Sequence, residues 1–321
     1  MRYKLLGLFI LSFSVVISCP SPQDNLPDGK ELTEEINLNN YVPFSADNKL
    51  AVLTENATIQ FLNYYLPRLD GATALYPVYA SFVQATYPST QVYYPFYESR
   101  VKCSTTPYAF TNLIAGGVDI IFTAAPSQDQ ISLAAEKEKT FSLTPIGKDA
   151  FVFFVNKQNP VNNLSIEQIR GIYSGKITNW KEVGGNDGEI YAFQRNRDSG
   201  SQTALISIMD GVPLMQAPMT LGSMADGPSK VADYRNHGNS IGYSFLFYTT
   251  EMVNNNEIKL LSINNVMPTI ETIRSDEYLF SGSFYAITTG DESENVKVLI
   301  EWILSDQGQY LIEKTGYVPI R

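Results

Sequence analysis

Apolar runs of strand length alternate with apolar stripes of helical period along this chain, and this alternation restricts its fold more than any other feature. The runs VDIIFTA and AFVFFVN are continuously apolar, as in strands that are covered on both faces. A helical stripe with spacing i, i+3, i+4, i+7 and i+8 consists of Leu75, Val78, Tyr79, Phe82 and Val83. Alternating strands and helices predict an α/β fold. We expect each sheet to be mixed but mostly parallel, and to be flanked by helices.

Two further helix signals continue this pattern toward the C-terminus. Ser165 and Gln168 open the segment SIEQIRGIYSGK with the spacing of a capping box. A second apolar stripe consists of Val296, Leu299, Ile300, Ile303 and Leu304. In α/β sheets, ligands bind beyond the carboxyl ends of strands, where helix N-termini point.

The first residues predict export across a membrane. Arg2 and Lys4 precede the run LLGLFILSFSVVIS, which is too short to span a bilayer but has the length of the apolar part of a secretory signal. The run leads into VISC, which resembles the lipobox of bacterial lipoproteins, with Cys19 as the lipidated residue. We expect residues 1–18 to be a signal peptide. An ordinary signal peptide with an incidental cysteine is the alternative.

The segment after Cys19 is polar and acidic, contains proline and has little apolar periodicity, so we expect residues 19–46 to form a tether. About 275 residues remain, which exceeds the usual size of a single core and favours two lobes. Lipidation of Cys19 would leave Cys103 as the other cysteine, so no intrachain disulfide or cysteine zinc site is expected. We expect neither metal nor cofactor.

The segment FQRNRDSGSQTAL predicts an anion site, although the chain is acidic. Its formal net charge of −10 becomes −12 without Arg2 and Lys4, which argues against nucleic acid as a partner. The segment lies where a strand (EIYAF) is expected to end and a helix (TALISIMDG) to begin, so backbone N–H groups would converge near Gly200. A capped helix with solvated arginines is the alternative. Thr73 likewise either contacts a ligand or caps the helix that follows it.

Seven segments resemble the phosphate-binding proteins that serve bacterial ABC transporters, within the type II, two-lobed periplasmic binding protein superfamily. The segments, in order, are DGATALYPVYASFVQATYP, NLIAGGVDIIFTAAP, TPIGKDAFVFFVNKQNPVNNLSIEQIRGIYSGKITNWKEVGG, RNRDSGSQT, NSIGYSFLFY, VMPTIETI and LSDQGQYLIEKTGYVPI. The resemblance implies two lobes that are joined by crossing strands and close on a ligand as a hinge. Crossings near residues 145–149 and 276–284 would give lobe 1 residues 47–145 and 284–321, and lobe 2 residues 146–283.

The resemblance also implies which residues bind the ligand. The matched positions are Thr73, Ala74, Thr106 (or Thr105 beside it), Arg195, Ser199, Gly200 and Ser201. Thr105 and Thr106 replace a serine in a glycine-rich turn, so the backbone of this turn is expected to differ from that of the family. Thr73, Ser199 and Ser201 would donate hydroxyl hydrogen atoms, Ala74 and Gly200 backbone N–H groups, and Arg195 a charged fork.

Three positions depart from the family pattern. Ala124 replaces the aspartate that accepts the proton of monohydrogen phosphate, so we expect phosphate and sulfate to be poorly distinguished. Arg197 replaces an acid, and we favour a surface charge over a second ligand clamp. Asp198 replaces a glycine. It either caps the following helix, which we favour, or turns inward as a second acceptor.

The resulting hypothesis is a monomeric, lipid-anchored protein of the cell envelope that passes phosphate, or a similar tetrahedral oxyanion, to an ABC permease without catalysis. One alternative is an envelope phosphatase or ester hydrolase in which His237, the single histidine, activates Ser199 or Ser201. The sequence has no zinc signature, phosphate loop or nucleophile elbow. The other alternative is a receptor-like protein that binds a different ligand in the same cleft.

Overall fold

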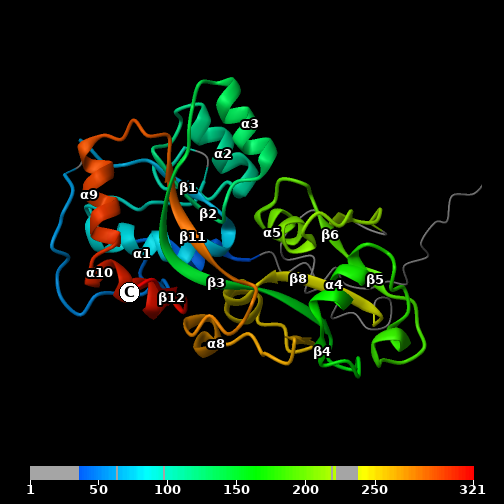
Figure 1. Cartoon of the computed structure of the whole chain (residues 1–321). Helices are drawn as coiled ribbons and strands as arrows, with labels where there is room; N and C mark the ends of the chain where they lie inside the picture. Colours follow the sequence, from blue (N-terminus) through cyan, green and yellow to red (C-terminus); the bar gives the residue numbers. More distant parts are fainter. Residues whose placement is uncertain (1–35, 63, 97, 218–219, 222–237) are drawn as a thin grey trace, which may run out of the picture. The chain divides into compact units, whose positions relative to one another are not determined.

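One long strand, β3 (Ser142–Asn156), runs through the middle of the main sheet (Figure 1). Its side chains contribute to two separate apolar cores. The computed structural model describes residues 36–321 except 63, 97, 218–219 and 222–237, and all described residues belong to one compact unit. Ile146 of β3 packs in the first core, and Phe151, Val152 and Phe153 pack in the second core. The chain therefore passes from one core to the other within this strand.

The main sheet is mixed. Its strands in spatial order are β1 (Leu69–Gly71), β2 (Ile120–Thr123), β11 (Ser281–Thr288), β3, β8 (Ser240–Phe245) and β5 (Tyr191–Ala192), while β9 (Ile258–Leu260) and β12 (Val318–Pro319) also pair with β3. Two small parallel pairs are β4 (Asn163–Leu164) with β10 (Ser262–Ile263) and β6 (Gln194–Arg195) with β7 (Thr220–Leu221).

The pairing differs from the mostly parallel sheets that the sequence predicts. Pairs β1–β2 and β5–β8 are parallel, but β3 pairs antiparallel with β8, β9, β11 and β12. The physical reason is that the chain leaves the first core along β3 and returns along β11, so these neighbours run in opposite directions (Figure 1). Asp149 of β3 lies opposite Gly282 of β11 in this ladder. The expected α/β fold is confirmed.

The first core lies against the part of the sheet that contains β1, β2 and β11. Its helices are α1 (Tyr76–Thr86), α9 (Glu294–Ile303) and α10 (Asp306–Thr315), with α2 (Thr106–Ile114) and α3 (Gln128–Glu136) following β1 and β2. The stripe predicted on α1 is buried throughout, because its side chains pack on the sheet and on α10. In the stripe predicted on α9, Val296, Leu299 and Ile303 are buried and Ile300 and Leu304 are partly buried.

The second core surrounds β8 and the C-terminal half of β3. Its helical segments are α4 (Ile166–Tyr173), η3 (Trp180–Val183), α5 (Gly200–Met209) and α8 (Ile270–Arg274), whereas Met252 of η4 (Tyr248–Val253) packs on the first core. The predicted capping box begins α4, where Ser165 and Gln168 bond to each other's backbone N–H groups. The strand VDIIFTA corresponds to β2, and AFVFFVN to the end of β3. The lobe boundaries given by the resemblance stay a prediction.

The N-terminal described segment packs on the first core before residue 47. The helical turn η1 (Leu38–Tyr41) and Phe44 contact this core, and the side chain of Val42 is only 1% exposed. The predicted tether of residues 19–46 therefore differs from the structure over its last residues. The polar composition of this segment does not reveal the packing, because a few apolar side chains are enough to hold it on the core. Among the described residues, no helix is long and apolar enough to cross a membrane.

Candidate functional site

A cleft of about 690 Å³ is lined by segments of both cores. The residues that line it include all seven of the predicted ligand residues: Thr73, Ala74, Thr106, Arg195, Ser199, Gly200 and Ser201. We call these seven residues the donor cluster. The fold thus brings together segments that are more than 120 positions apart in the chain.

The N-terminus of α5 supplies the largest part of the donor cluster. Ser199 caps this helix, because its hydroxyl oxygen accepts the N–H of Gln202 at 3.3 Å. The side chain of Ser201 is only 3% exposed, and its hydroxyl oxygen has no hydrogen-bond partner among the described residues. A buried hydroxyl without a partner is costly, so the cleft offers a donor that a ligand can satisfy.

Gly200 brings the two sides of the cleft close together. A Cβ atom on Gly200 would lie 3.3 Å from Oγ1 of Thr106 and 3.9 Å from Cβ of Ala124. Thr106 begins α2 and Ala124 follows β2, whereas Gly200 begins α5. The N-termini of α2 and α5 therefore approach each other, and position 124 adjoins the same place. An acid at position 124 would therefore lie near the N-termini of α2 and α5.

Arg195 is held in place through its backbone. Its N–H group donates to Oε1 of Gln202 at 2.8 Å and to the hydroxyl oxygen of Tyr243 at 2.9 Å. Burial raises the pKa of Tyr243, so this phenol stays neutral. The half-buried side chain of Arg195 lines the cleft next to the N-terminus of α5.

The loop before α2 is fixed by a buried carboxylate. Asp70 accepts the N–H of Ser104 at 2.8 Å, its hydroxyl at 2.5 Å and the side-chain amide of Asn112 at 2.8 Å. Thr105 follows with φ 71° and ψ 161°, a conformation that favours glycine and is strained for a β-branched residue. The constraint from Asp70 thus places the buried Thr106 hydroxyl at the cleft.

Thr73 does not act as a helix cap through its side chain. The turn η2 (Thr73–Leu75) begins after Ala72 and has no side-chain cap bond, and α1 begins after Leu75, also without one. The Thr73 side chain instead contacts the thiol of Cys103, whose pKa burial raises to about 12. Capping is therefore the wrong interpretation of Thr73, which lines the cleft together with the buried Ala74.

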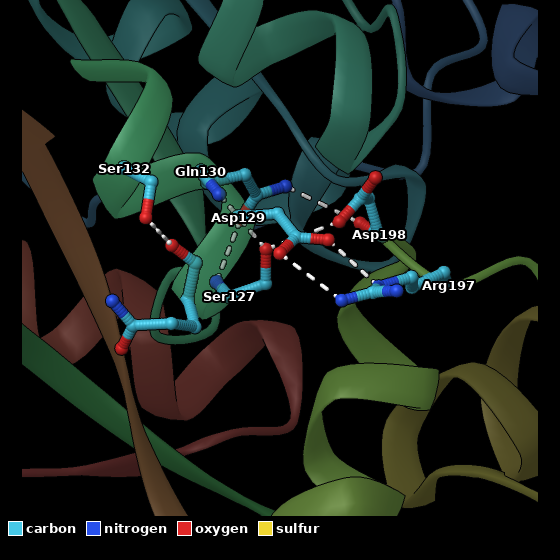
Figure 2. A network of polar contacts seen from close by, with 7 residues as sticks. Ser127, Asp129, Gln130, Ser132, Arg197 and Asp198 are labelled. Atoms are coloured by element: carbon cyan, nitrogen blue, oxygen red, sulfur yellow. Dashed lines mark hydrogen bonds and ion pairs between the residues drawn. The ribbon is translucent and has the colours of Figure 1, made fainter. Parts of the chain in front are cut away.

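A second group of polar residues joins the loop before α5 to the N-terminal part of α3 (Figure 2), and two of its members, Arg197 and Asp198, also line the cleft. We call Ser127, Asp129, Gln130, Arg197 and Asp198 the rim contacts. Nε of Arg197 lies 2.7 Å from Oδ2 of Asp129, and Nη2 lies 3.1 Å from Oδ1. The Ser127 hydroxyl donates to Oδ1 of Asp198 at 3.1 Å, and the Gln130 amide donates to the Asp198 carbonyl oxygen at 3.3 Å.

The rim contacts test the predicted roles of Arg197 and Asp198. Arg197 is a surface charge, with a side chain that is 77% exposed, although it is paired rather than only solvated. The prediction that Asp198 caps α5 is wrong, because Ser199 occupies the capping position and the Asp198 carboxylate accepts from Ser127. A glycine at position 198 could not make this contact.

Comparisons with known proteins identify the family of this chain. The family model of the PBP superfamily domain matches residues 62–307, more than half of the chain. The chain belongs to the PBP superfamily. The phosphate-binding protein PstS of Borreliella burgdorferi is 27% identical over 195 residues, which cover 58% of this chain and 68% of that protein.

Solved structures share the fold of this PBP superfamily protein. A putative phosphate ABC transporter substrate-binding protein from Clostridium perfringens, solved with bound phosphate, matches with TM-score 0.62 and 24% identity over 79% of this chain and 98% of that chain. An ABC-type phosphate transport receptor from Vibrio cholerae matches with TM-score 0.58 and 22% identity over 78% of this chain and 98% of that chain.

The sequence interpretation missed Asp149, which also lines the cleft of this PBP superfamily protein. Its carboxylate accepts the N–H of Ala150 at 2.7 Å and the backbone N–H groups of Leu246 and Phe247. Burial raises the pKa of Asp149 from 3.8 to about 7. The available signal was an acid inside the otherwise apolar crossing strand, in TPIGKDAFVFFVN.

Two predicted residues, Cys19 and His237, lie outside the residues that the structure describes. Within the described part of the chain, no group of three or more histidine, cysteine, aspartate or glutamate side chains could hold a metal ion. The donor cluster contains cationic and neutral hydrogen-bond donors, which suit an anion rather than a cation.

Proposed function

We propose that this PBP superfamily protein captures inorganic phosphate, or a similar tetrahedral oxyanion, in its cleft for uptake by an ABC transporter. The observation that carries the proposal is the approach of the α2 and α5 N-termini at Gly200, beside the buried Ser201 hydroxyl that has no partner among the described residues. The relatives support it, because PstS of Borreliella burgdorferi is named a phosphate-binding protein and the Clostridium perfringens structure holds phosphate.

The chemistry of the donor cluster suits four oxygen atoms that point in different directions. The N-terminus of α5 supplies backbone N–H groups and a favourable field for negative charge. Arg195 adds a charged donor from the same side, and the hydroxyls of Thr73 and Thr106 come from the other side. A planar carboxylate would leave part of this set unsatisfied, whereas a tetrahedral anion can reach both sides of the cleft.

We further propose that the protein works outside the cytoplasm, anchored by lipid at Cys19, and passes its ligand to a membrane permease as a monomer. The apolar N-terminal run and VISC support the anchor. Cys19→Ser should move the protein from the detergent phase to the aqueous phase while the soluble body stays folded. Unchanged partitioning would contradict lipidation.

A seryl hydrolase is the less favoured function. A nucleophilic serine needs a general base within hydrogen-bond reach, and His237, the residue considered for this role, lies outside the described residues. The Ser199 hydroxyl oxygen accepts the N–H of Gln202, which leaves its hydrogen available for a ligand oxygen, as an oxyanion site requires. We therefore expect no turnover of phosphate monoesters by the wild type or by His237→Ala. Turnover that depends on His237 would overturn the binding function.

The decisive experiment identifies the ligand that the protein retains. The protein is purified without added anions and denatured, and the released anions are separated and identified. Calorimetry of the ligand-free protein against phosphate, sulfate and phosphate monoesters then gives the affinity for each. Binding of none of these anions would refute the proposed function.

A further inference from the structure

Asp149 is half-buried, and the strand position opposite it leaves free space. It lies on β3 opposite Gly282 of β11, so the two positions share one face of the sheet. Both residues line the cleft, and a Cβ atom on Gly282 would meet no heavy atom within 4 Å. The face of the crossing strands at Asp149 is therefore open to the interior of the cleft.

The partners of Asp149 are neutral. Its carboxylate accepts backbone N–H groups of Ala150, Leu246 and Phe247, and no ion pair of this residue is found among the described residues. These bonds lower the pKa, but burial outweighs them and raises the pKa to about 7. Neutral donors stabilise the carboxylate without cancelling its charge.

The charged and titratable groups around Asp149 come from each neighbouring element. Lys148, the preceding residue on β3, pairs with Asp276, with Nζ 2.6 Å from Oδ1. Tyr317, next to β12, has a raised pKa, first from burial and then from the charge of Asp149. Tyr248 follows the two donating amides and lines the cleft. β11 contributes Gly282 and Ser283, which do not titrate at neutral pH.

Across the cleft, Arg195 and Asp198 are the other charged residues of the lining near the donor cluster, together with Arg197. Asp198 accepts from Ser127, and Arg197 pairs with Asp129. An ionised Asp149 would thus place a negative charge in the same cleft as an arriving dianion. Like charges in such a site repel over several ångströms.

We propose that Asp149 couples anion capture to proton uptake, so that the cleft takes a dianion together with one proton on this carboxyl group. The idea rests on the proposed function of the cleft. The proton comes from solvent and goes to a carboxylate oxygen of Asp149, and no bond of the anion changes. Below the pKa of Asp149 the carboxyl is already neutral and affinity is highest. Above it, each binding event requires a proton, so affinity falls as pH rises.

Sulfate is the most informative probe, because its own charge does not change between about pH 6 and about pH 8.5, so any pH dependence belongs to the protein. Calorimetry in two buffers with different ionisation heats counts the protons taken up for each anion bound. We expect wild-type affinity for sulfate to fall by several-fold, at most about tenfold, for each pH unit above about 7. Proton uptake should approach one for each sulfate at the upper end of this range.

Asp149→Asn should keep the acceptor for the backbone N–H groups but remove the titration, giving a sulfate affinity that no longer changes with pH and no proton uptake. Asp198→Asn is the matched control, because Asp198 also lines the cleft, and it should keep the wild-type pH dependence. For phosphate, whose own titration is common to all variants, proton uptake should be lower in Asp149→Asn than in wild type.

The outcomes separate the two proposals. If wild type binds neither anion, the proposed function fails, and the role of Asp149 fails with it. If an anion binds but Asp149→Asn and wild type take up the same number of protons, only the role of Asp149 is refuted. If Asp149→Asn does not fold, the wild-type profile decides alone, since sulfate or phosphate binding without extra proton uptake above pH 7 contradicts the coupling.

Discussion

Residues 195–201 contribute to both the donor cluster and the rim contacts, yet the charges of these two sets differ in what surrounds them. Arg195 is half-buried and belongs to the donor cluster, whereas Arg197, two positions later, is 77% exposed and paired with Asp129. Rim groups satisfy one another in the structure, while the Ser201 hydroxyl of the donor cluster has no partner among the described residues. Burial therefore distinguishes the donor cluster, which has a hydrogen-bond donor available for a ligand, from the rim contacts, whose groups bond to one another.

The largest expected effect tests the donor cluster at Arg195. Arg195→Ala should weaken oxyanion binding by about 2–4 kcal/mol, roughly 30-fold to 1000-fold, because a charged donor to the ligand is lost. Calorimetry with phosphate measures the change, and Arg197→Ala is the matched control with the same loss of charge. Equal effects of the two substitutions would show that burial does not distinguish the two arginines.

The next effect concerns the acceptor that position 124 lacks. Ala124→Asp should favour phosphate over sulfate by about 1–3 kcal/mol relative to wild type, because a carboxylate accepts the proton of monohydrogen phosphate but repels a dianion without a proton. Ala125→Asp adds the same charge at an exposed neighbouring position and should change the ratio little. A wild type that already rejects sulfate by several orders of magnitude would contradict this prediction.

A smaller effect is expected at Ser201. Ser201→Ala should weaken anion binding by about 1 kcal/mol, roughly fivefold, because one neutral hydrogen bond to the ligand is lost. The same substitution should leave the thermal stability of the ligand-free protein unchanged or slightly higher, since it removes a buried hydroxyl without a partner among the described residues. Loss of stability without loss of affinity would place the hydroxyl outside the ligand site.

The smallest effect tests the rim contacts. Arg197→Ala should weaken anion binding by about 0.2–1 kcal/mol, because an exposed ion pair contributes little. This loss should shrink at high salt, where exposed charges are screened. The exchange Arg197→Asp with Asp129→Arg should restore affinity through the reversed pair. A loss of affinity as large as that of Arg195→Ala would show that the rim contacts belong to the binding site.

Local patterns in the sequence predicted the helices better than they predicted the sheet. The stripe through Val78 and Phe82 and the capping box at Ser165 depend on neighbours within a few positions, so they can be read locally. The antiparallel pairing of β3 with β11 joins residues about 130 positions apart, and no local period encodes it. The cleft residues came from the family resemblance, which already contains such long-range information.

Asp149 shows why part of the site could not be predicted. An acid in a strand is usually explained by exposure, and the sequence gives no sign that Leu246 and Phe247 will donate to this one. Its access to the cleft depends on Gly282, which only the register of β11 places opposite it. Likewise, the cap of α5 could not be assigned between Asp198 and Ser199, because both are good capping residues and Ser127 decides the outcome from another segment.

The shared strand β3 has a consequence for how the protein unfolds. Ile146 belongs to the first core and Val152 to the second, within one continuous strand that also holds β8 and β11 in place. If either core unfolds, β3 loses packing contacts and hydrogen bonds to its neighbouring strands. The other core is then destabilised, because it contains part of the same strand. The two cores should therefore melt in one cooperative transition, with calorimetric and van't Hoff enthalpies that agree, rather than as two independent domains.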